Sequence, residues 1–197
     1  AILDRVVKIN VPYCLELDQE IKIYEKILGL SDFKAHIAPH TIKVASMFSV
    51  MSRLKKSGKC DVLTKMKIYN GEEVIEKGRV KNIDINDLRD EHREEGMNGI
   101  STRFIMKAID HALVMSENHC VTPIGVMKSL TKMVKEQIVD EDFRERCLEI
   151  VQNVVREEYL KILETEIAKA FITAYEEQAQ SLFDTYLDNS LHYKTEA

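Results

Sequence analysis

The residues most suggestive of chemistry lie in the phrase Glu95–Phe104, which reads Glu-Gly-Met-Asn-Gly-Ile-Ser-Thr-Arg-Phe. Ser101 is a preferred N-cap residue, because its hydroxyl oxygen can accept a hydrogen bond from a free backbone N–H, and the glycines before it allow a sharp turn. Arg103 then falls in the first turn of the expected helix, at the end that attracts anions. A cation there does not stabilise the helix, so Arg103 suggests a ligand such as phosphate. The alternative is an ordinary solvated arginine.

Other patterns that carry catalysis are missing from the sequence. No G-x-x-x-x-G-K-[ST] phosphate loop occurs among the seven glycines, so this chain alone is not expected to hydrolyse ATP. Leu88–Asp90 lacks the histidine and asparagine of a kinase catalytic loop, and Asp142–Arg144 lacks the glycine of D-F-G. No serine lies in a G-x-S-x-G elbow. We therefore expect no catalytic residue in this chain.

Metal binding is not expected either. His36 and His40 are four residues apart, but Pro39 lies between them and is expected to set a helix start, so the two rings need not share a face. The four cysteines form no C-x-x-C pair and are interpreted as reduced thiols. They are Cys14, Cys60, Cys120 and Cys147.

Length and composition indicate a folded protein. A chain of 197 residues with 45% hydrophobic content can form one substantial domain, or a domain with an appendage. No apolar run approaches the roughly 18 residues of a membrane helix, and the charged start Ala1–Arg5 does not fit a signal peptide. We expect a cytoplasmic protein that binds no membrane.

The charge is unevenly distributed. Residues 140–197 hold 6 basic and 14 acidic side chains, whereas residues 1–139 hold 22 and 19. This acidic excess argues against broad nucleic-acid binding, which needs basic surface. One basic cluster is interpreted as a solvated helix end. It consists of Arg53, Lys55, Lys56 and Lys59, with Lys65 and Lys67 nearby.

The first half of the chain contains one strand candidate and several helices. Residues 6–12 are rich in β-branched side chains and end at a proline. A lone strand of this kind needs partners from another chain or from an earlier part of a larger protein. Asp18 is expected to cap a helix that Gly29 ends. A second helix follows Pro39, a short one covers 60–69, and 72–83 is expected to be extended or loop.

The second half is expected to be helical. A short polar helix spans Asp84–Glu94, another follows Ser101, and Thr122 with Pro123 marks the start of a third. Asp140 opens a long helical region that reaches residues 186–187. No Gly or Pro occurs in residues 126–197, yet a break is expected, because one helix of that length is unusual outside coiled coils.

Four segments make the chain resemble the C-terminal portion of the bacterial PrkA serine protein kinase family, which carries an AAA+ ATPase core. They are Asp4-Arg5 with Val11-Pro12-Tyr13; His36-Ile37-Ala38-Pro39-His40-Thr41 through Met47-Phe48-Ser49-Val50; Glu95-Gly96-Met97 through Phe104; and Ala170-Phe171 through Tyr175-Glu176-Glu177, Leu182-Phe183-Asp184 and Tyr186-Leu187-Asp188-Asn189.

The resemblance implies a mainly α fold. Residues 1–16 would end with the last strand of a truncated AAA+ core, so that the helical lid is preceded by one orphan β-strand. Residues 17–134 would form the AAA+ lid, with an insertion at about 57–100, and residues 135–197 a C-terminal helical extension. Arg103 matches the sensor 2 arginine that reaches the terminal phosphates of ATP.

The resemblance also implies ligands and partners. Arg5 is similar to the arginine that AAA+ relatives supply in trans, as a finger to the nucleotide of a neighbouring subunit. ATP and Mg²⁺ would be bound by the N-terminal core of the same polypeptide rather than by this part alone. The complete protein would be an ATP-dependent serine protein kinase and a homo-oligomer, with a protein substrate that these residues do not identify.

Two other readings stay open. The chain could be a freestanding all-α interaction or oligomerisation module whose acidic tail docks a partner or a second copy. A helix-turn-helix DNA reader in residues 84–134 is weaker, because its recognition helix would offer only Lys128 and Lys132 to phosphates.

Overall fold

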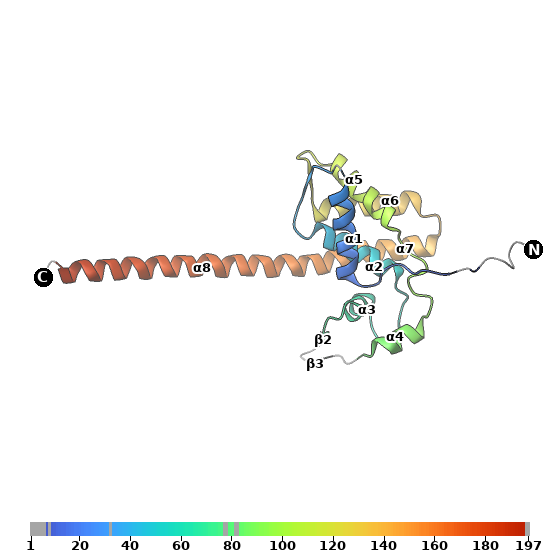
Figure 1. The fold of residues 1–197 in the computed structure, drawn as a ribbon, viewed down its shortest axis with the longest axis horizontal. Helices are drawn as coiled ribbons and strands as arrows, with labels where there is room; N and C mark the ends of the chain where they lie inside the picture. The colour runs from blue at the N-terminus through green and yellow to red at the C-terminus, as the bar shows by residue number, and fades with distance from the viewer. Residues whose placement is uncertain (1–6, 8, 32, 77–78, 81–82, 196–197) are drawn as a thin grey trace, which may run out of the picture. The chain divides into compact units, whose positions relative to one another are not determined.

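A computed structural model describes residues 7, 9–31, 33–76, 79–80 and 83–195 (Figure 1). The chain forms two compact units, residues 1–156 and residues 157–197. The first unit holds the core of packed helices and the candidate site. The second consists of most of one long helix, and each unit is described by itself below.

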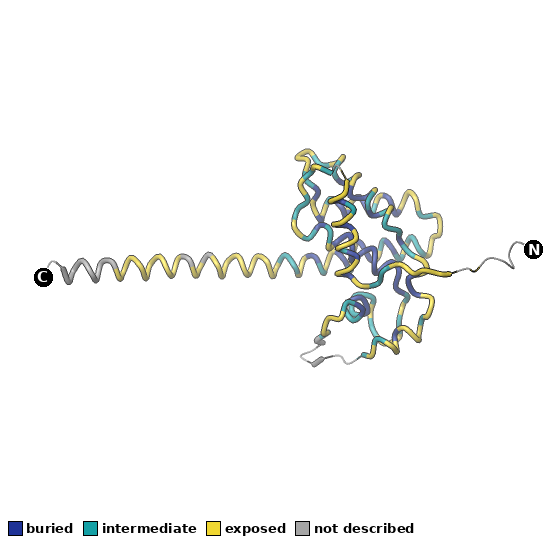
Figure 2. Tube along the Cα trace, in the orientation of Figure 1, coloured by how far each residue is buried: buried dark blue, intermediate teal, exposed yellow. Residues whose placement is uncertain are grey.

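The core of the first unit is built around α2 (Thr41–Arg53). Every residue from Val44 to Arg53 is buried, so this part of the helix is surrounded on all sides rather than amphipathic (Figure 2). Around it pack α1 (Leu17–Leu30), α5 (Thr102–Val114), α6 (Pro123–Gln137) and α7 (Glu141–Glu149). The predicted helix after Pro39 is confirmed, and the structure buries its serines and its arginine as well as its apolar side chains.

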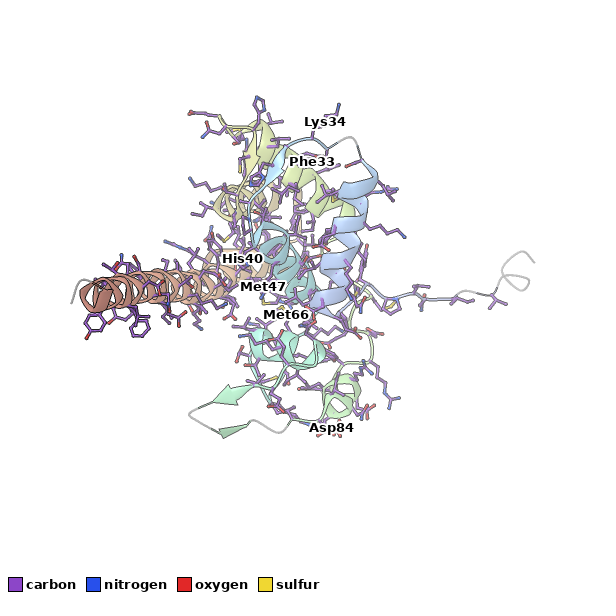
Figure 3. All side chains as sticks on the ribbon, turned by 60° about the vertical axis from the view of Figure 1, so that its left-hand side comes forward. Phe33, Lys34, His40, Met47, Met66 and Asp84 are labelled. Carbon is purple, nitrogen blue, oxygen red and sulfur yellow. The ribbon has the colours of Figure 1, made fainter. Side chains whose placement is uncertain are left out.

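A smaller group of elements follows α2 in the chain. It comprises α3 (Val62–Tyr69), the antiparallel strands β2 (Ile75–Glu76) and β3 (Arg79–Val80), and α4 (Ile85–Glu91). Met47 of α2 and Met66 of α3 are both buried, and Figure 3 shows the two side chains in the interior where these helices meet. Asp61 caps α3 and Asp84 caps α4, each accepting a hydrogen bond from a first-turn amide.

A short parallel pair joins two distant loops. Strand β1 (His36–Ile37) pairs with β4 (Cys120–Val121), with His36 opposite Cys120. His40 lies at the N-cap of α2 with a φ of 64°, so His36 and His40 do not share a helix face. Thr41 donates its hydroxyl proton to the carbonyl oxygen of Val121, which ties the start of α2 to β4.

The helix starts predicted for the second half are confirmed. The side chains of Ser101, Thr122 and Asp140 accept hydrogen bonds from Phe104, Gly125 and Phe143. A break without glycine or proline is also confirmed, because residues 138–140 separate α6 from α7. After α7 the chain continues through the π-helical turn η2 (Ile150–Val154) into α8 (Val155–Thr195).

Two local predictions about the first half differ from the structure. Asp18 does not cap α1: Glu16 occupies the N-cap position, and the Asp18 amide donates instead to the side chain of Asn70 at 2.9 Å. Gly29 does not end the helix, which continues to Leu30 and closes when the Ser31 amide and hydroxyl donate to the Leu28 carbonyl. In both cases a nearby polar side chain replaces the expected cap.

The mainly α fold is confirmed. Of the expected strand at residues 6–12, residues 7 and 9–12 are described, and they are exposed and unpaired. A strand whose partners lie outside the chain would have nothing to pair with here. The division of the chain at residues 16 and 134 stays a prediction. None of the described helices combines the length and apolar character needed to cross a bilayer.

Candidate functional site

Arg103 is exposed in the first turn of α5, where the sequence placed it. Ser101 accepts the amide of Phe104 at 3.3 Å and so satisfies one of the amides that open the helix. Within the described part of the chain, the Arg103 guanidinium has no hydrogen bond or ion pair. It is therefore available to an external anion, and the positive end of the helix favours the same kind of ligand.

The backbone before α5 follows a path that two glycines make possible. Gly96 has a φ of 80° and Gly99 a φ of 134°, both in the region that L side chains rarely adopt. A Cβ on Gly99 would lie 2.6 Å from Cγ of Arg53 and 2.9 Å from its Cα. The segment that leads to Arg103 thus crosses directly over the last residue of α2, with no room for a side chain.

Arg53 is the centre of a buried polar network. Its guanidinium pairs with Glu20 of α1 at 2.7 Å, and the two side chains are 0% and 1% exposed. The same nitrogen lies 2.7 Å from the Ser49 hydroxyl, and Tyr24 donates its phenol proton to Glu20. Because the charges neutralise each other and are hydrogen-bonded, both can stay in the interior.

The guanidinium also contacts the two chain segments that flank the network. Nε and Nη2 donate to the Ile100 carbonyl oxygen at 3.2 and 3.1 Å, and Nη1 donates to that of Cys14 at 2.8 Å. The Tyr13 ring covers Arg53 with 4.7 Å between the guanidinium carbon and the ring centroid. Arg53 therefore joins residues before α1 to the residue that precedes the Ser101 cap.

A second buried pair fastens the start of the Glu95–Phe104 phrase. Lys65 of α3 binds Glu95 at 2.5 Å, and their side chains are 0% and 3% exposed. The amide of Lys55 and the phenol of Tyr69 donate to the two oxygens of the same carboxylate. The phrase is consequently held at Glu95 by α3 and at Ile100 by α2.

The negative charges in these networks change the acidity of two tyrosines. Burial raises the pKa of Tyr24 well above its ordinary value, and the adjacent Glu20 carboxylate raises it further. The pKa of Tyr69 is raised for the same reasons, with Glu95 as the neighbouring carboxylate. Both phenols stay protonated and act as hydrogen-bond donors across the physiological range.

The basic cluster predicted as a solvated helix end is only partly so. Arg53 and Lys65 are buried in the two ion pairs, so that part of the interpretation is wrong. Their carboxylate partners come from elements 30 or more residues away in the sequence, and no local pattern shows such a pairing. One signal was present: Glu20 lies three residues after Leu17 and four before Tyr24, on the apolar face of its helix.

Shallow hollows lie beside the phrase and beside α1. One of about 490 Å³ is lined by Pro12, Cys14 and Glu95 together with the charged side chains of Arg89, Asp90 and Arg93. The other, of about 470 Å³, lies between α1 and the start of α2, where His40 and Lys43 line it. Arg103 lines neither of these two hollows.

The other predicted site residue, Arg5, lies outside the described residues. Of the two arginines that the sequence suggests as site residues, the structure therefore places only Arg103. Its geometry suits an anionic oxygen: a planar guanidinium can hold two oxygens of a phosphate, and the start of α5 adds a favourable field. Among the described residues, the exposed guanidinium without a partner is compatible with binding a terminal phosphate.

Two models of one family match consecutive parts of the chain. The family model described as "PrkA AAA domain" matches residues 1–61, and that described as "PrkA serine protein kinase C-terminal domain" matches residues 63–197. The "ATP-dependent protease PrkA" of Bacillus subtilis is 39% identical over 96% of this chain and 30% of its own length. The "Serine/threonine kinase YeaG" of Escherichia coli K12 is 34% identical over 95% of this chain and 29% of its own. The chain thus spans about 30% of these relatives, and no solved structure matches it.

Proposed function

The chain belongs to the PrkA family, and from this membership we propose that it is the lid and regulatory region of an AAA+ ATPase that senses nucleotide through Arg103. The observation that carries the proposal is the exposed guanidinium at the start of α5, without a partner among the described residues. In the complete protein this side chain would contact the terminal phosphates of ATP bound by the N-terminal core.

ATP with Mg²⁺ supplies the phosphoryl group and the free energy of hydrolysis in such a protein. This chain's residues would do three things: Arg103 binds phosphate oxygens, the start of α5 orients that side chain, and α2 holds the start of α5 in place. Arg5 is proposed as the finger that enters the nucleotide site of a neighbouring subunit, and this requires a homo-oligomer.

The complete protein is proposed to be an ATP-dependent serine protein kinase, in line with the family description. The names of the two relatives differ, since one is called a serine/threonine kinase and the other an ATP-dependent protease. The role proposed for Arg103 is the same in both, because each chemistry would follow a nucleotide-dependent movement of the helices. The protein substrate is not identified by the residues of this chain.

The direct test is ATP hydrolysis by the complete protein carrying Arg103→Ala. Charge-assisted hydrogen bonds to phosphate contribute enough that we expect a fall of about ten- to a hundredfold. Lys107→Ala is the matched control, since Lys107 is exposed one turn further along α5 and should leave the rate unchanged. Wild-type hydrolysis and nucleotide-dependent assembly in Arg103→Ala would overturn the proposal.

A second candidate function is an interaction module, and the surface of α8 favours it. Its exposed apolar side chains include Ile167, Phe171 and Tyr175, at successive spacings of four residues, with Leu182 and Phe183 beyond. Sedimentation of the chain with and without ATP separates the two candidates. Self-association that is indifferent to nucleotide would favour the module.

A further inference from the structure

We propose that Arg53 is a positioning residue, which couples residues 12–16 to the start of α5 and so sets the place of Arg103. The proposal rests on the proposed function of Arg103, which it deepens by naming what controls that side chain. Arg53 itself is buried, so its proposed role is indirect.

The coupling starts from the geometry of one guanidinium. Its rigid fork of N–H donors faces in different directions at once. One edge donates to the Cys14 carbonyl at 2.8 Å, and another donates to the Ile100 carbonyl through two N–H groups at 3.2 and 3.1 Å. Two segments that are far apart in sequence are therefore fixed against the same group of atoms.

The two segments also bind each other. The amide of Tyr13 donates to the Gly96 carbonyl at 2.8 Å, and the Gly96 amide donates to the Arg53 carbonyl at 3.4 Å. Around Gly96 there is little free space, because an added Cβ would lie 3.0 Å from the Tyr13 carbonyl oxygen. A displacement of residues 12–16 cannot be absorbed locally and would be passed to residues 96–100.

The last step leads to Arg103. The amide of Ile100 donates to the Ser52 hydroxyl at 2.9 Å, so both backbone groups of Ile100 are held by the end of α2. Ser101 follows immediately and caps α5, and Arg103 lies in the first turn. Arg103 lies only three residues after Ile100, so a shift of Ile100 cannot be absorbed by the chain between them.

Glu20 anchors the Arg53 guanidinium to α1. It holds the guanidinium from α1 at 2.7 Å and balances its charge in the interior. A lysine at position 53 could still pair with Glu20, but its single ammonium group cannot donate to Glu20, Cys14 and Ile100 with the same planar spacing. Arg53→Lys therefore tests the fork while it keeps the charge.

The experiment compares binding of a non-hydrolysable ATP analogue with binding of ADP in the complete protein. Arg53→Lys is expected to lower the preference for the analogue over ADP by about tenfold, the scale of a lost hydrogen bond to a charged group. A loss of folded protein would lower both affinities or the number of sites, and would leave the ratio unchanged. Hydrogen exchange without nucleotide adds a second readout: peptides covering 12–16 and 96–104 should exchange faster together.

The double variant Arg53→Lys, Arg103→Ala decides how Arg53 acts. If it works through Arg103, adding Arg53→Lys to Arg103→Ala lowers the preference no further. Additive losses would overturn the coupling, and so would an unchanged preference in Arg53→Lys when Arg103→Ala has a reduced one. An unchanged preference in Arg103→Ala would instead overturn the proposed function, and the coupling with it.

Two further variants provide a milder perturbation of the same contact and a control for destabilisation. Ser52→Ala removes only the acceptor of the Ile100 amide, and it should give a smaller loss of preference, about threefold, that also disappears in the Arg103→Ala background. Ser52→Ala replaces Arg53→Lys in the test if Arg53→Lys does not fold. Val151→Ala truncates a buried side chain of η2 and controls for general destabilisation. An equal loss of preference in Val151→Ala would contradict a specific role of Arg53.

Discussion

Arg53 holds the carbonyl oxygen of Ile100, 47 residues further along the chain, through Nε at 3.2 Å and Nη2 at 3.1 Å. This contact joins the end of the central helix α2 to the start of α5, the helix that carries Arg103. The position of the exposed Arg103 guanidinium is thus linked to that of the buried Arg53 guanidinium. Arg53 needs the Glu20 carboxylate to balance its charge in the interior, whereas Arg103 is available to a ligand.

Removing Glu20 should destabilise the chain strongly. Glu20→Ala leaves the Arg53 guanidinium buried without its counter-charge, and such a loss costs about 3–5 kcal/mol. Urea unfolding followed by circular dichroism measures the change. Lys59→Ala breaks the exposed pair with Asp87 and should leave the midpoint unmoved. An unmoved unfolding midpoint in Glu20→Ala as well would show that the buried pair is not needed for stability.

Gly99→Ala should be harmful, whereas Gly29→Ala should not. At Gly99 the φ of 134° and the 2.6 Å approach to Arg53 oppose any side chain, so we expect a loss of about 1–3 kcal/mol or more. Gly29 lies in α1 with open space around it, and alanine there should stabilise by about 0.5–1 kcal/mol. Thermal unfolding of both variants checks the pair, and equal effects would contradict the close crossing.

The sequence predicts local features of this chain better than contacts between distant elements. Caps such as Ser101, Thr122 and Asp140 depend on neighbours within three residues, and they were predicted correctly. The ion pairs of Arg53 and Lys65 depend on carboxylates from distant elements, and a run of basic residues suggested solvent instead. The position of Arg103 in the first turn of α5 was predicted from the local pattern, because a helix start is a local feature.

Tyr24 and Tyr69 should ionise only when the chain unfolds. Burial and the carboxylates of Glu20 and Glu95 raise both pKa values above that of an unfolded tyrosine, near 10. The stabilisation from these phenols is complete below the unfolded pKa and is lost as the pH rises through the folded pKa. In an alkaline titration, the absorbance of ionised tyrosine should show a late phase that coincides with unfolding. Tyr24→Phe and Tyr69→Phe should each reduce the amplitude of that phase. Early, non-cooperative ionisation of all tyrosines would be inconsistent with the buried networks.

Cys147 should be inert towards thiol reagents in the folded chain. It is fully buried in α7, and burial raises the pKa of its thiol to about 12, so the reactive thiolate is scarce near pH 8. Labelling with an alkylating reagent and mass spectrometry should modify Cys147 only after denaturant is added. Cys14, Cys60 and Cys120 are partly exposed and serve as internal comparisons. Labelling of Cys147 at their rates would argue that the α7 packing is loose.

The most direct measurement is the dissociation constant of a non-hydrolysable ATP analogue, and of ADP, for the complete protein and its Arg103→Ala variant. If Arg103 contacts the terminal phosphate, the variant loses affinity for the analogue by about tenfold or more while its affinity for ADP changes little. Equal affinity of the variant and the wild type for the analogue would contradict the account.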